Sequence, residues 1–290
     1  MIGCLGIIGG SGLYNLNGLK NTEWIKIDTP WGNPSDEILT GELNGLKINF
    51  LPRHGRGHIH SPSTVPYKQN IFALKKLGVS DILSVSACGS LREDLVPGDF
   101  VLVDQFIDRT YLREKSFFGK GCVAHVSLAN PTCNRLSKII FDIGKKINIK
   151  IHFGGTYLTM EGPQFSTLAE SKIYKENWKC DVIGMTNMPE AKLAREAEIC
   201  YTSLSMVTDF DCWHPDHESV EVSDIIQTLT NNSSKAQNLI ENLPTELIKN
   251  RDKCNLGCNN SLDNALITSP EKRNKKIIND LEIILKRLNK

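Results

Sequence analysis

Short apolar runs alternate along the chain with segments whose apolar residues recur at helical spacing. The apolar runs predict buried strands at residues 5–8, 48–51, 82–85, 100–103, 182–185 and 201–207. The segments between them predict helices at residues 67–77, 136–147, 166–178 and 190–198. Strands that are apolar throughout are typical of a mostly parallel sheet with both faces covered. We therefore expect an α/β fold with a mixed, mostly parallel sheet flanked by helices.

The 290-residue chain is long enough for one large domain, and its composition turns polar after Leu243-Pro244. We expect an α/β domain over 1–245 whose last helix is 222–243, a polar cysteine-containing strap over 246–268, and an amphipathic C-terminal helix over 269–290. Ser269-Pro270 suits the start of that helix. Its apolar face, which predicts docking on the domain or an oligomer contact, consists of Ile277, Ile278, Leu281, Ile284, Leu285 and Leu288.

The formal net charge is +1 and no basic face is evident, which argues against a nucleic-acid partner. No segment approaches the roughly 20 apolar residues that a transmembrane helix needs. The first residues also lack the basic region of a signal peptide. We expect a cytoplasmic protein with no membrane partner.

The nine cysteines fall into two groups by context. Those that stand singly in apolar runs are expected to be buried, reduced thiols: Cys4, Cys88, Cys180 and Cys200. Cys254 and Cys258 lie in a polar segment, where a zinc site would need a second close pair of cysteines or histidines, and none is near in the sequence. A local disulfide or two free thiols is expected there, and no metal site is predicted.

Three of the predicted strands are followed by residues suited to binding an anion. The first leads into Gly9-Gly10-Ser11-Gly12, the second into Arg53-His54, and the third into Ser86-Ala87. The glycine turn lacks the spacing of a dinucleotide fingerprint, a Walker loop or a nucleophile elbow, which leaves a phosphate nest or a plain tight turn. Because ligands collect at the carboxyl ends of strands in open α/β sheets, the three endings are expected to converge on one phosphate.

The segment Arg53-His54-Gly55-Arg56-Gly57-His58-Ile59-His60 holds five ionisable residues. A guanidinium beside an imidazole suits a phosphate or sulfate dianion through forked, charge-assisted hydrogen bonds. Zinc bound by His54, His58 and His60 is the alternative, but neither a cysteine nor a carboxylate stands close by to complete the ligand set.

Asp209 and Asp211 follow the last predicted strand two residues apart, so in an extended turn they point the same way. Carboxylates accept hydrogen bonds when ionised and donate when protonated. The pair therefore suits a ring that carries an amino group and a basic nitrogen, and a solvated or capping pair is the alternative.

Six motifs occur in one order: GIIGGSGL at 6–13, PRHGR at 52–56, SACGSL at 86–91, DQFIDR at 104–109, EGPQFS at 161–166 and TDFD at 208–211. Together they closely resemble the 5′-methylthioadenosine phosphorylases, within the trimeric purine nucleoside phosphorylase family. The resemblance implies the single-domain purine nucleoside phosphorylase-like fold, assembled as a homotrimer or a dimer of trimers. Relatives of this kind usually end near residue 268, so 269–290 is expected to be an addition.

The resemblance also implies the site residues. Inorganic phosphate would be held by Ser11, Arg53, His54, Ser86, Ala87 and Thr186. Met185 would lie against the ribose, Phe165 and Ser166 on the base side, and Asp209 and Asp211 against adenine N7 and its 6-amino group. The 5′-methylthio pocket would be walled by Val222, Ile225 and Ile226, with His125 contributed by a neighbouring subunit. Specificity would rest on Ser166, Asp209 and Val222.

The activity implied is phosphorolysis of 5′-methylthioadenosine to adenine and 5-methylthioribose 1-phosphate, with inorganic phosphate as co-substrate and no metal or organic cofactor. Asp209 would be the catalytic acid, provided that burial beside Asp211 keeps a proton on it. A phosphorylase of broad or 6-oxopurine specificity is the alternative, and a nucleoside-binding sensor is the non-enzymatic one. Some hyperstable relatives cross-link the positions matching Cys133 and Cys200 and are cysteine-rich near Cys254 and Cys258, so disulfides are possible at these pairs.

Overall fold

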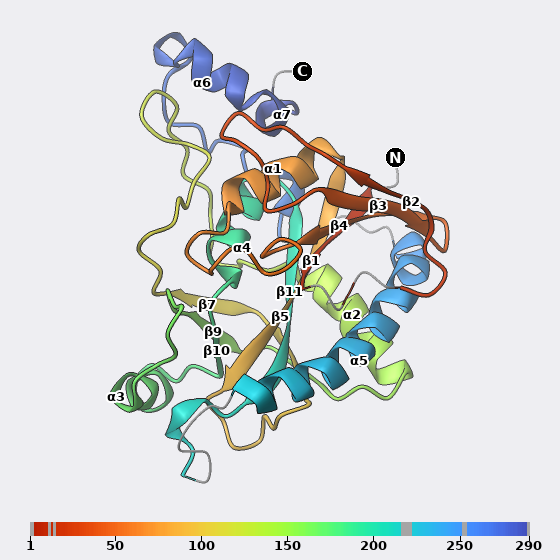
Figure 1. Cartoon of the computed structure of the whole chain (residues 1–290). Coiled ribbons are helices and arrows are strands. Elements are labelled where there is room, and N and C mark those ends of the chain that lie inside the picture. Colours follow the sequence, from red (N-terminus) through yellow and green to blue (C-terminus); the bar gives the residue numbers. More distant parts are fainter. Residues whose placement is uncertain (1–2, 11–12, 14–15, 216–221, 251–253, 289–290) are drawn as a thin grey trace.

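Eleven strands of the described residues form one mixed sheet (Figure 1). The computed structural model describes residues 3–10, 13, 16–215, 222–250 and 254–288. The strands are β1 (Cys4–Gly9), β2 (Lys20–Ile25), β3 (Ile38–Leu43), β4 (Leu46–Pro52), β5 (Val79–Ser90), β6 (Phe100–Val103), β7 (Gln105–Asp108), β8 (Ile151–Phe153), β9 (Thr156–Thr159), β10 (Val182–Gly184) and β11 (Cys200–Asp209). Their main path runs β2-β3-β4-β1-β5-β10-β9-β7, while β11 pairs with β5 and β6, and β8 pairs with β6.

The long central strand β5 determines where the site lies. It pairs in parallel with β1 on one side and β11 on the other, so that Ile82 lies opposite both Gly6 and Tyr201. β4 is parallel to β1. The carboxyl ends of β4, β1, β5 and β11 therefore meet at one edge of the sheet, which confirms the predicted mixed, mostly parallel arrangement.

Helices cover both faces of the sheet. In Figure 1, α1 (Tyr67–Lys76) and α4 (Asn187–Glu196) pack on one face, and α2 (Asn134–Lys146) and α5 (Val222–Lys249) on the other. The predicted helix 166–178 is α3 (Leu168–Lys172) followed by a π-helical turn, Ile173–Asn177. Thr167 caps α3 in a capping box with Glu170, which explains why the helix begins two residues later than expected.

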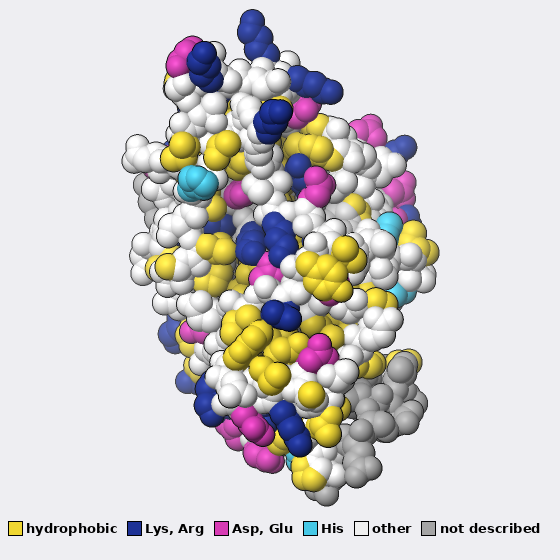
Figure 2. Space-filling view, turned by 90° about the vertical axis from the view of Figure 1, so that its left-hand side faces the viewer, with side chains coloured by type: hydrophobic (Ala, Val, Ile, Leu, Met, Phe, Trp, Pro, Cys, Tyr) yellow, Lys and Arg dark blue, Asp and Glu magenta, His cyan; other side chains and the backbone are white. Residues whose placement is uncertain are grey.

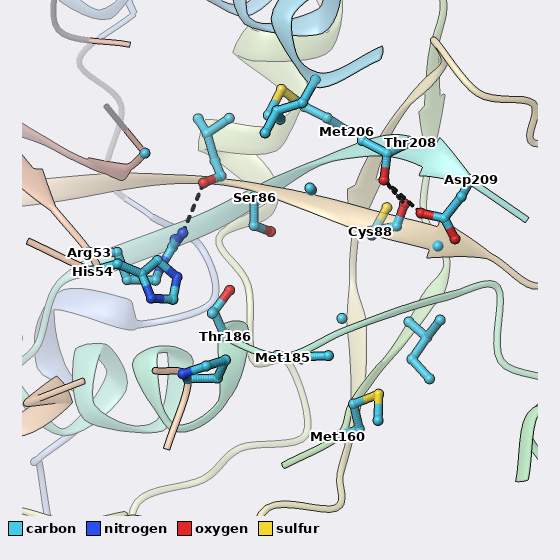
Figure 3. Close-up of a pocket in the computed structure, with 18 of the residues that line it drawn as sticks. Arg53, His54, Ser86, Cys88, Met160, Met185, Thr186, Met206, Thr208 and Asp209 are labelled. Atoms are coloured by element: carbon cyan, nitrogen blue, oxygen red, sulfur yellow. Dashed lines mark hydrogen bonds between the residues drawn. The ribbon is translucent and has the colours of Figure 1, made fainter. Parts of the chain in front are cut away.

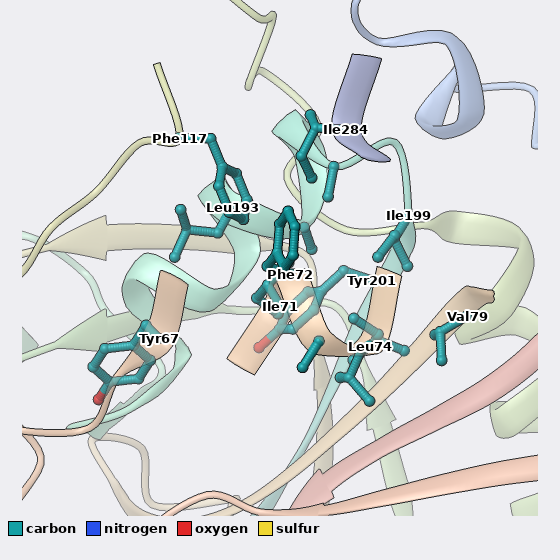
Figure 4. Packing of buried hydrophobic residues seen from close by; sticks show 14 of the residues in the cluster. Tyr67, Ile71, Phe72, Leu74, Val79, Phe117, Leu193, Ile199, Tyr201 and Ile284 are labelled. Carbon is teal, nitrogen blue, oxygen red and sulfur yellow. The ribbon is translucent and has the colours of Figure 1, made fainter. Parts of the chain in front are cut away.

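The core beneath α1 and α4 holds this half of the molecule together. Ile71 and Phe72 of α1 pack with Leu193 of α4 and Tyr201 of β11, and all four side chains are buried (Figure 4). Each such side chain contributes about 1.5–3 kcal/mol relative to leaving it in water. Ile284, from the C-terminal segment, closes the outer side of the same cluster.

The C-terminal third departs from the prediction. α5 continues through Pro244 to Lys249 rather than ending at residue 243. The segment 269–290 is not one helix, because it contains two short helices, α6 (Lys275–Asp280) and α7 (Glu282–Leu285), which meet at Leu281. Its predicted apolar face does dock on the domain, with Leu281, Ile284 and Leu285 buried against the α1 cluster. Among the described residues, none of the helices combines the length and apolar character needed to cross a membrane.

Candidate active site

A cavity of about 380 Å³ opens at the edge where the carboxyl ends of the central strands meet. Its walls come from residues after β4, from 86–89 in β5, from 183–186 at the end of β10 and just after it, and from the end of β11. Figure 3 shows two chemically different ends: Arg53, His54, Ser86 and Thr186 lie together at one, and Thr208 and Asp209 lie at the other. The cavity therefore offers a cationic and hydroxyl-rich end opposite a carboxyl end.

Arg53 is buried at the first end, and the protein itself holds most of its donors. Its Nε donates to Glu190 Oε1 at 2.5 Å, its Nη1 to the carbonyl of Val85 at 3.0 Å, and its Nη2 to Ser84 Oγ at 2.6 Å. Burial works to lower the pKa of Arg53, but the adjacent Glu190 carboxylate outweighs it and the net direction is upward. The guanidinium stays charged, and one N–H of Nη1 is left for an anion. Bidentate binding of an anion by both Nη1 and Nη2 would require Nη2 to give up its hydrogen bond to Ser84 or to Glu190.

Glu190 was not predicted as a site residue, although it fixes the position of Arg53. It lies in α4 and is 1% exposed. Its Oε2 also accepts hydrogen bonds from Ser84 at 2.8 Å and from Tyr201 at 3.1 Å. A buried carboxylate held by three donors orients the arginine without leaving either charge unpaired.

His54 stands beside Arg53 as a neutral ring. Burial, reinforced by the positive charge of Arg53, lowers the pKa of His54 to about 4. Its Nδ1 lies 2.8 Å from the carbonyl of His60, and because a carbonyl only accepts, the proton sits on Nδ1. Nε2 is therefore an acceptor at neutral pH unless a bound anion restores its second proton.

The depressed pKa of His54 predicts a specific loss of stability in acid. Since the folded-state pKa lies below the unfolded value of 6.5, the contribution is fully present above pH 6.5 and disappears as the pH falls towards 4. At pH 4.5 the loss is expected to reach about 2.5 kcal/mol.

Urea titrations of the wild type and of His54→Gln at pH 7.5 and 4.5 measure this contribution to the free energy of unfolding. Between the two pH values the variant is expected to lose less stability than the wild type, by the amount that His54 contributes. Saturating phosphate should reduce the wild-type loss, because an anion favours the protonated ring. Equal pH dependence in both proteins would contradict the assignment.

Ser86 and Thr186 bring two hydroxyls to the same end. Ser86 lies in β5, and its Oγ donates to Asn187 Oδ1 across a long 3.4 Å contact. Thr186 precedes α4, and no described residue hydrogen-bonds its hydroxyl, which points towards the cavity in Figure 3. Both hydroxyls are thus available to an anion next to Arg53.

A bulge in β11 positions the side chains at the carboxyl end of the cavity. Val207 lies opposite Cys88 and Asp209 opposite Gly89, so Thr208 is one extra residue in the ladder. Such a bulge re-aims the side chains around it. Thr208 Oγ1 lies 2.8 Å from Asp209 Oδ2, and the amide of Asp211 donates to Asp209 Oδ1 at 2.8 Å. A side chain in place of Gly89 would press on Asp209, because its Cβ would lie 2.8 Å from Oδ1.

Asp211 is the more buried of the two carboxyls, and its backbone has a positive φ of 49°. Burial raises the pKa of Asp211, and the charge of Asp209 acts in the same direction. The hydrogen bond from Ser171 Oγ, at 2.5 Å, offsets part of this effect. The predicted carboxyl pair therefore exists and lines the cavity, and Asp211 is tied to α3 through Ser171.

Apolar side chains separate the two ends. Met160, Met185 and Met206 line the middle of the cavity (Figure 3), with Leu13 and Leu229 further along the wall. Phe165 lines it as well and is 49% exposed. Methionines adapt to the shape of a ligand, so this stretch suits a sugar and a thioether.

A second buried ion pair supports this wall. Arg113 Nε donates to Glu161 Oε1 at 3.0 Å, and its Nη1 donates to the carbonyls of Met185 at 2.6 Å and Met188 at 2.7 Å. Glu161 in turn accepts from the amides of Tyr111 and Leu112. Despite burial, hydrogen bonds from Ser63, from these two amides and from Arg113 hold the pKa of Glu161 down to about 2. Arg113, which fixes the backbone beneath Met185, was not predicted as a site residue.

Most of the predicted site residues that the structure describes line the cavity: Arg53, His54, Ser86, Ala87, Phe165, Met185, Thr186, Asp209 and Asp211. Ser166 stands just behind the wall, 3.7 Å from Met160 Sδ. The expectation that Ile226 walls the 5′ pocket is corrected, because Ile226 is 57% exposed on α5. From that helix, Leu229 and Ser233 line the cavity instead. Ser11 and the side chains of Val222 and Ile225 lie outside the described residues.

His125 is not in the wall of the protomer's own cavity. It lies in the exposed loop before α2, where its amide donates to the carbonyl of Ala265 at 2.9 Å. That position is compatible with the expectation that it serves a neighbouring subunit. No two of the nine cysteines form a disulfide in the structure, so the possible disulfides are not observed.

A cavity with an anion-binding end and a carboxyl end suits an anion and a nitrogen base bound side by side. The sequence model of the Phosphorylase superfamily matches residues 5–243, and the chain belongs to that family. It is 60% identical to the S-methyl-5′-thioadenosine phosphorylase of Cereibacter sphaeroides, over 99% of this chain and 98% of that one. It is 55% identical to the enzyme of the same name from Rhodospirillum rubrum, over 98% and 96% of the two chains.

Solved structures of methylthioadenosine phosphorylases are similar to this chain as well. A methylthioadenosine phosphorylase from an antarctic soil metagenomic library superposes with a TM-score of 0.92 at 47% identity, covering 98% of this chain and all of that one. The methylthioadenosine phosphorylase of Schistosoma mansoni in complex with adenine gives a TM-score of 0.84 at 34% identity, covering 91% and 99%. Because the Cereibacter relative covers 99% of the chain, the expectation that 269–290 is an addition without counterpart is wrong.

Proposed function

We propose that this protein is a 5′-methylthioadenosine phosphorylase, which converts its nucleoside and inorganic phosphate to adenine and 5-methylthioribose 1-phosphate. The observation that carries the proposal is the single cavity with Arg53, Ser86 and Thr186 at one end and Asp209 at the other. The names of the relatives above support the same substrate.

In the proposed reaction, the bond between C1′ and the purine nitrogen breaks while positive charge develops on the ribose. A phosphate dianion held at the Arg53 end stabilises that charge and then forms the new bond to C1′. The purine leaves with its electron pair, and Asp209 donates a proton to N7 so that it leaves neutral. The reaction as proposed needs inorganic phosphate and no organic cofactor.

The 5′ group is assigned from the apolar part of the wall. Leu13, Met206 and Leu229 present carbon and sulfur to the ligand. A methylthio group loses little water on entering such a wall, whereas a hydroxyl would lose a hydrogen-bond partner. We therefore place 5′-methylthioadenosine ahead of adenosine, and both ahead of inosine.

Purine release from methylthioadenosine, adenosine and inosine, measured with and without phosphate, tests the proposal. We expect phosphate-dependent release, with kcat/KM highest for methylthioadenosine by about 10- to 100-fold over adenosine. Faster release from inosine would favour the alternative, a phosphorylase of 6-oxopurine specificity. Binding without any release would favour a nucleoside sensor.

We further propose that the active form is a trimer in which His125 of one chain completes the neighbour's site. The face that carries β7 and α3 displays groups of hydrophobic side chains (Figure 2). In that part of the chain Tyr111 is 76% exposed and Leu112 68% exposed, more than a solitary protomer needs to leave in water. We also propose a cytoplasmic location, as expected from the sequence, which fits the lack of disulfides among the nine cysteines.

Light scattering at the assay concentration is expected to give three chain masses, or six if two trimers associate. Tyr111→Glu, which places a charge on the hydrophobic face, should shift the protein to smaller species and lower its activity in parallel. A fully active monomer would contradict the trimer and the assigned role of His125.

A further inference from the structure

Four cysteines that are far apart in the sequence converge on the side of the sheet that α2 and α5 cover. Cys133 precedes α2, Cys200 begins β11, and Cys254 and Cys258 lie in the segment after α5. Their four sulfur atoms all lie within 4.8 Å of one another. The second cysteine pair that the sequence lacked near Cys254 and Cys258 is thus supplied by the fold.

The spacing of the sulfurs is that of a coordination shell. Cys133 Sγ lies 3.5 Å from Cys254 Sγ, and Cys254 Sγ lies 3.2 Å from Cys258 Sγ. A disulfide requires about 2.05 Å. Four thiolates around Zn²⁺, each about 2.3 Å from the metal at tetrahedral angles, lie about 3.8 Å apart. Four sulfurs that are separate and mutually adjacent match the second arrangement.

Two arginines lie against the cluster. Arg195 Nη1 donates to Cys258 Sγ at 3.2 Å, and its other nitrogens are fixed by the carbonyls of Ser127 and Leu256, each at 3.1 Å. Arg135, which is also paired with Asp81, contacts the sulfur of Cys200. Zn²⁺ with four thiolates carries two negative charges, and the positive charge of Arg195, with the part of the Arg135 charge that Asp81 leaves, offsets it and orients the ligands.

We propose that Cys133, Cys200, Cys254 and Cys258 bind one Zn²⁺ ion in a tetrahedral, structural site. Four thiols release four protons as the thiolates take up the ion, and all four positions are filled by protein, which leaves none open for catalysis. None of the four residues lines the cavity described above. The site therefore lies outside the phosphorolysis machinery, and the proposal does not rest on the proposed function.

The ion would fasten the chain after α5 to the body of the protein. Beyond Cys258 the chain pairs with the loop before α2: the amide of His125 donates to Ala265, and the amide of Ile267 donates to Val123, at 2.8 Å. Apart from Cys258, which is buried, few side chains of 254–261 pack into the core. A metal that crosslinks this segment to α2 and β11 supplies the anchorage that packing does not.

Metal analysis of the full-length protein, purified under reducing conditions and dialysed without added metal, tests the site directly. We expect about one zinc per chain, released in step with the modification of cysteine by a mercurial. Cobalt(II) in its place should show the intense visible bands of tetrahedral thiolate coordination. Four freely titrating thiols without metal, stoichiometric iron, or a mass lower by the hydrogens of two disulfides would each overturn the assignment.

Cys254→Ser removes one ligand from the least buried corner of the cluster, and Cys122→Ala is the matched control, a buried cysteine outside it. Because loss of a mere supporting contact weakens metal sites by about 10- to 100-fold, the zinc content of Cys254→Ser should fall at least tenfold. Cys122→Ala should keep its zinc.

A strong chelator should lower the Tm of the wild type and of Cys122→Ala, and leave that of Cys254→Ser unchanged. If Cys254→Ser does not fold, the chelator shift of the wild type, reversed by added zinc, decides the question. A Tm insensitive to chelation in a protein that carries no zinc would refute the site, whatever the activity.

Discussion

Replacing Asp209 by asparagine is expected to lower adenine release from methylthioadenosine by about 10²- to 10⁴-fold, the contribution typical of a general acid. The side chain would keep its size and its place on the β11 bulge, where Thr208 and the amide of Asp211 hold it. What it would lose is the proton that N7 must receive. The rate of purine release at saturating phosphate is the measurement.

The same variant should affect 6-oxopurines far less. Inosine presents an acceptor at O6, and a carboxyl group with one O–H cannot donate to both O6 and N7, whereas an asparagine amide carries two N–H donors. A mismatched buried acceptor costs several kcal/mol, so the ratio of the two activities should shift by orders of magnitude towards inosine.

An exposed carboxylate provides the control. Asp94 lies outside the cavity and is paired with Arg92 on the surface, so Asp94→Asn should leave both activities unchanged. If Asp209→Asn lowers both base classes equally, Asp209 has a structural role and the assignment to adenine loses its main support.

The sequence predicted the central strands and failed at the edges of the sheet. The apolar run 82–85 marks only the middle of β5, which extends from Val79 to Ser90 because its ends, although they contain polar or small residues such as Ser80 and Gly89, still pair with β1 and β10. β2 is largely exposed, so it lacks the apolar pattern that identified the others. β8 (IHF at 151–153) and β9 (TYLT at 156–159) contain polar residues, so neither forms the continuous apolar run that identified the equally short β6 and β10.

The sequence likewise predicted some residues of the candidate site and missed others. Arg53, Ser86 and Asp209 were found because each follows an apolar strand, and strand ends are where open sheets bind ligands. Glu190 and Arg113 were missed because their charged partners lie far away in the chain: Arg53 is 137 residues from Glu190, and Glu161 is 48 residues from Arg113. One signal was present: Glu190 stands in α4 among Met188, Ala191 and Ala194, and a carboxylate on a buried face requires a partner.

The cysteine cluster shows why a metal site cannot always be predicted from the spacing of its ligands in the sequence. Cys254 and Cys258 are close in sequence, but Cys133 and Cys200 reach them only because α2 and β11 lie side by side in the fold. Local spacing therefore excluded a site that the tertiary structure assembles from three separate segments.

Replacing Arg53 by methionine is expected to lower the free energy of unfolding by about 3–5 kcal/mol, because Glu190 would remain buried without its cation. The same change should lower kcat/KM for phosphate by about 10- to 100-fold, the value of one charge-assisted hydrogen bond of about 1.5–3 kcal/mol. Urea denaturation and phosphate kinetics measure the two effects separately.

The double variant Arg53→Met/Glu190→Met separates the two roles of the arginine. Removing both charges leaves no unpaired ion in the core, so stability should recover by about 1–4 kcal/mol relative to the single variant. Phosphate use should not recover, because the double variant still lacks the guanidinium at the anion end of the cavity. Recovery of both properties would show that the single variant failed through misfolding and that phosphate binds elsewhere. Recovery of stability alone would make Arg53 the anion contact and Glu190 the residue that positions it.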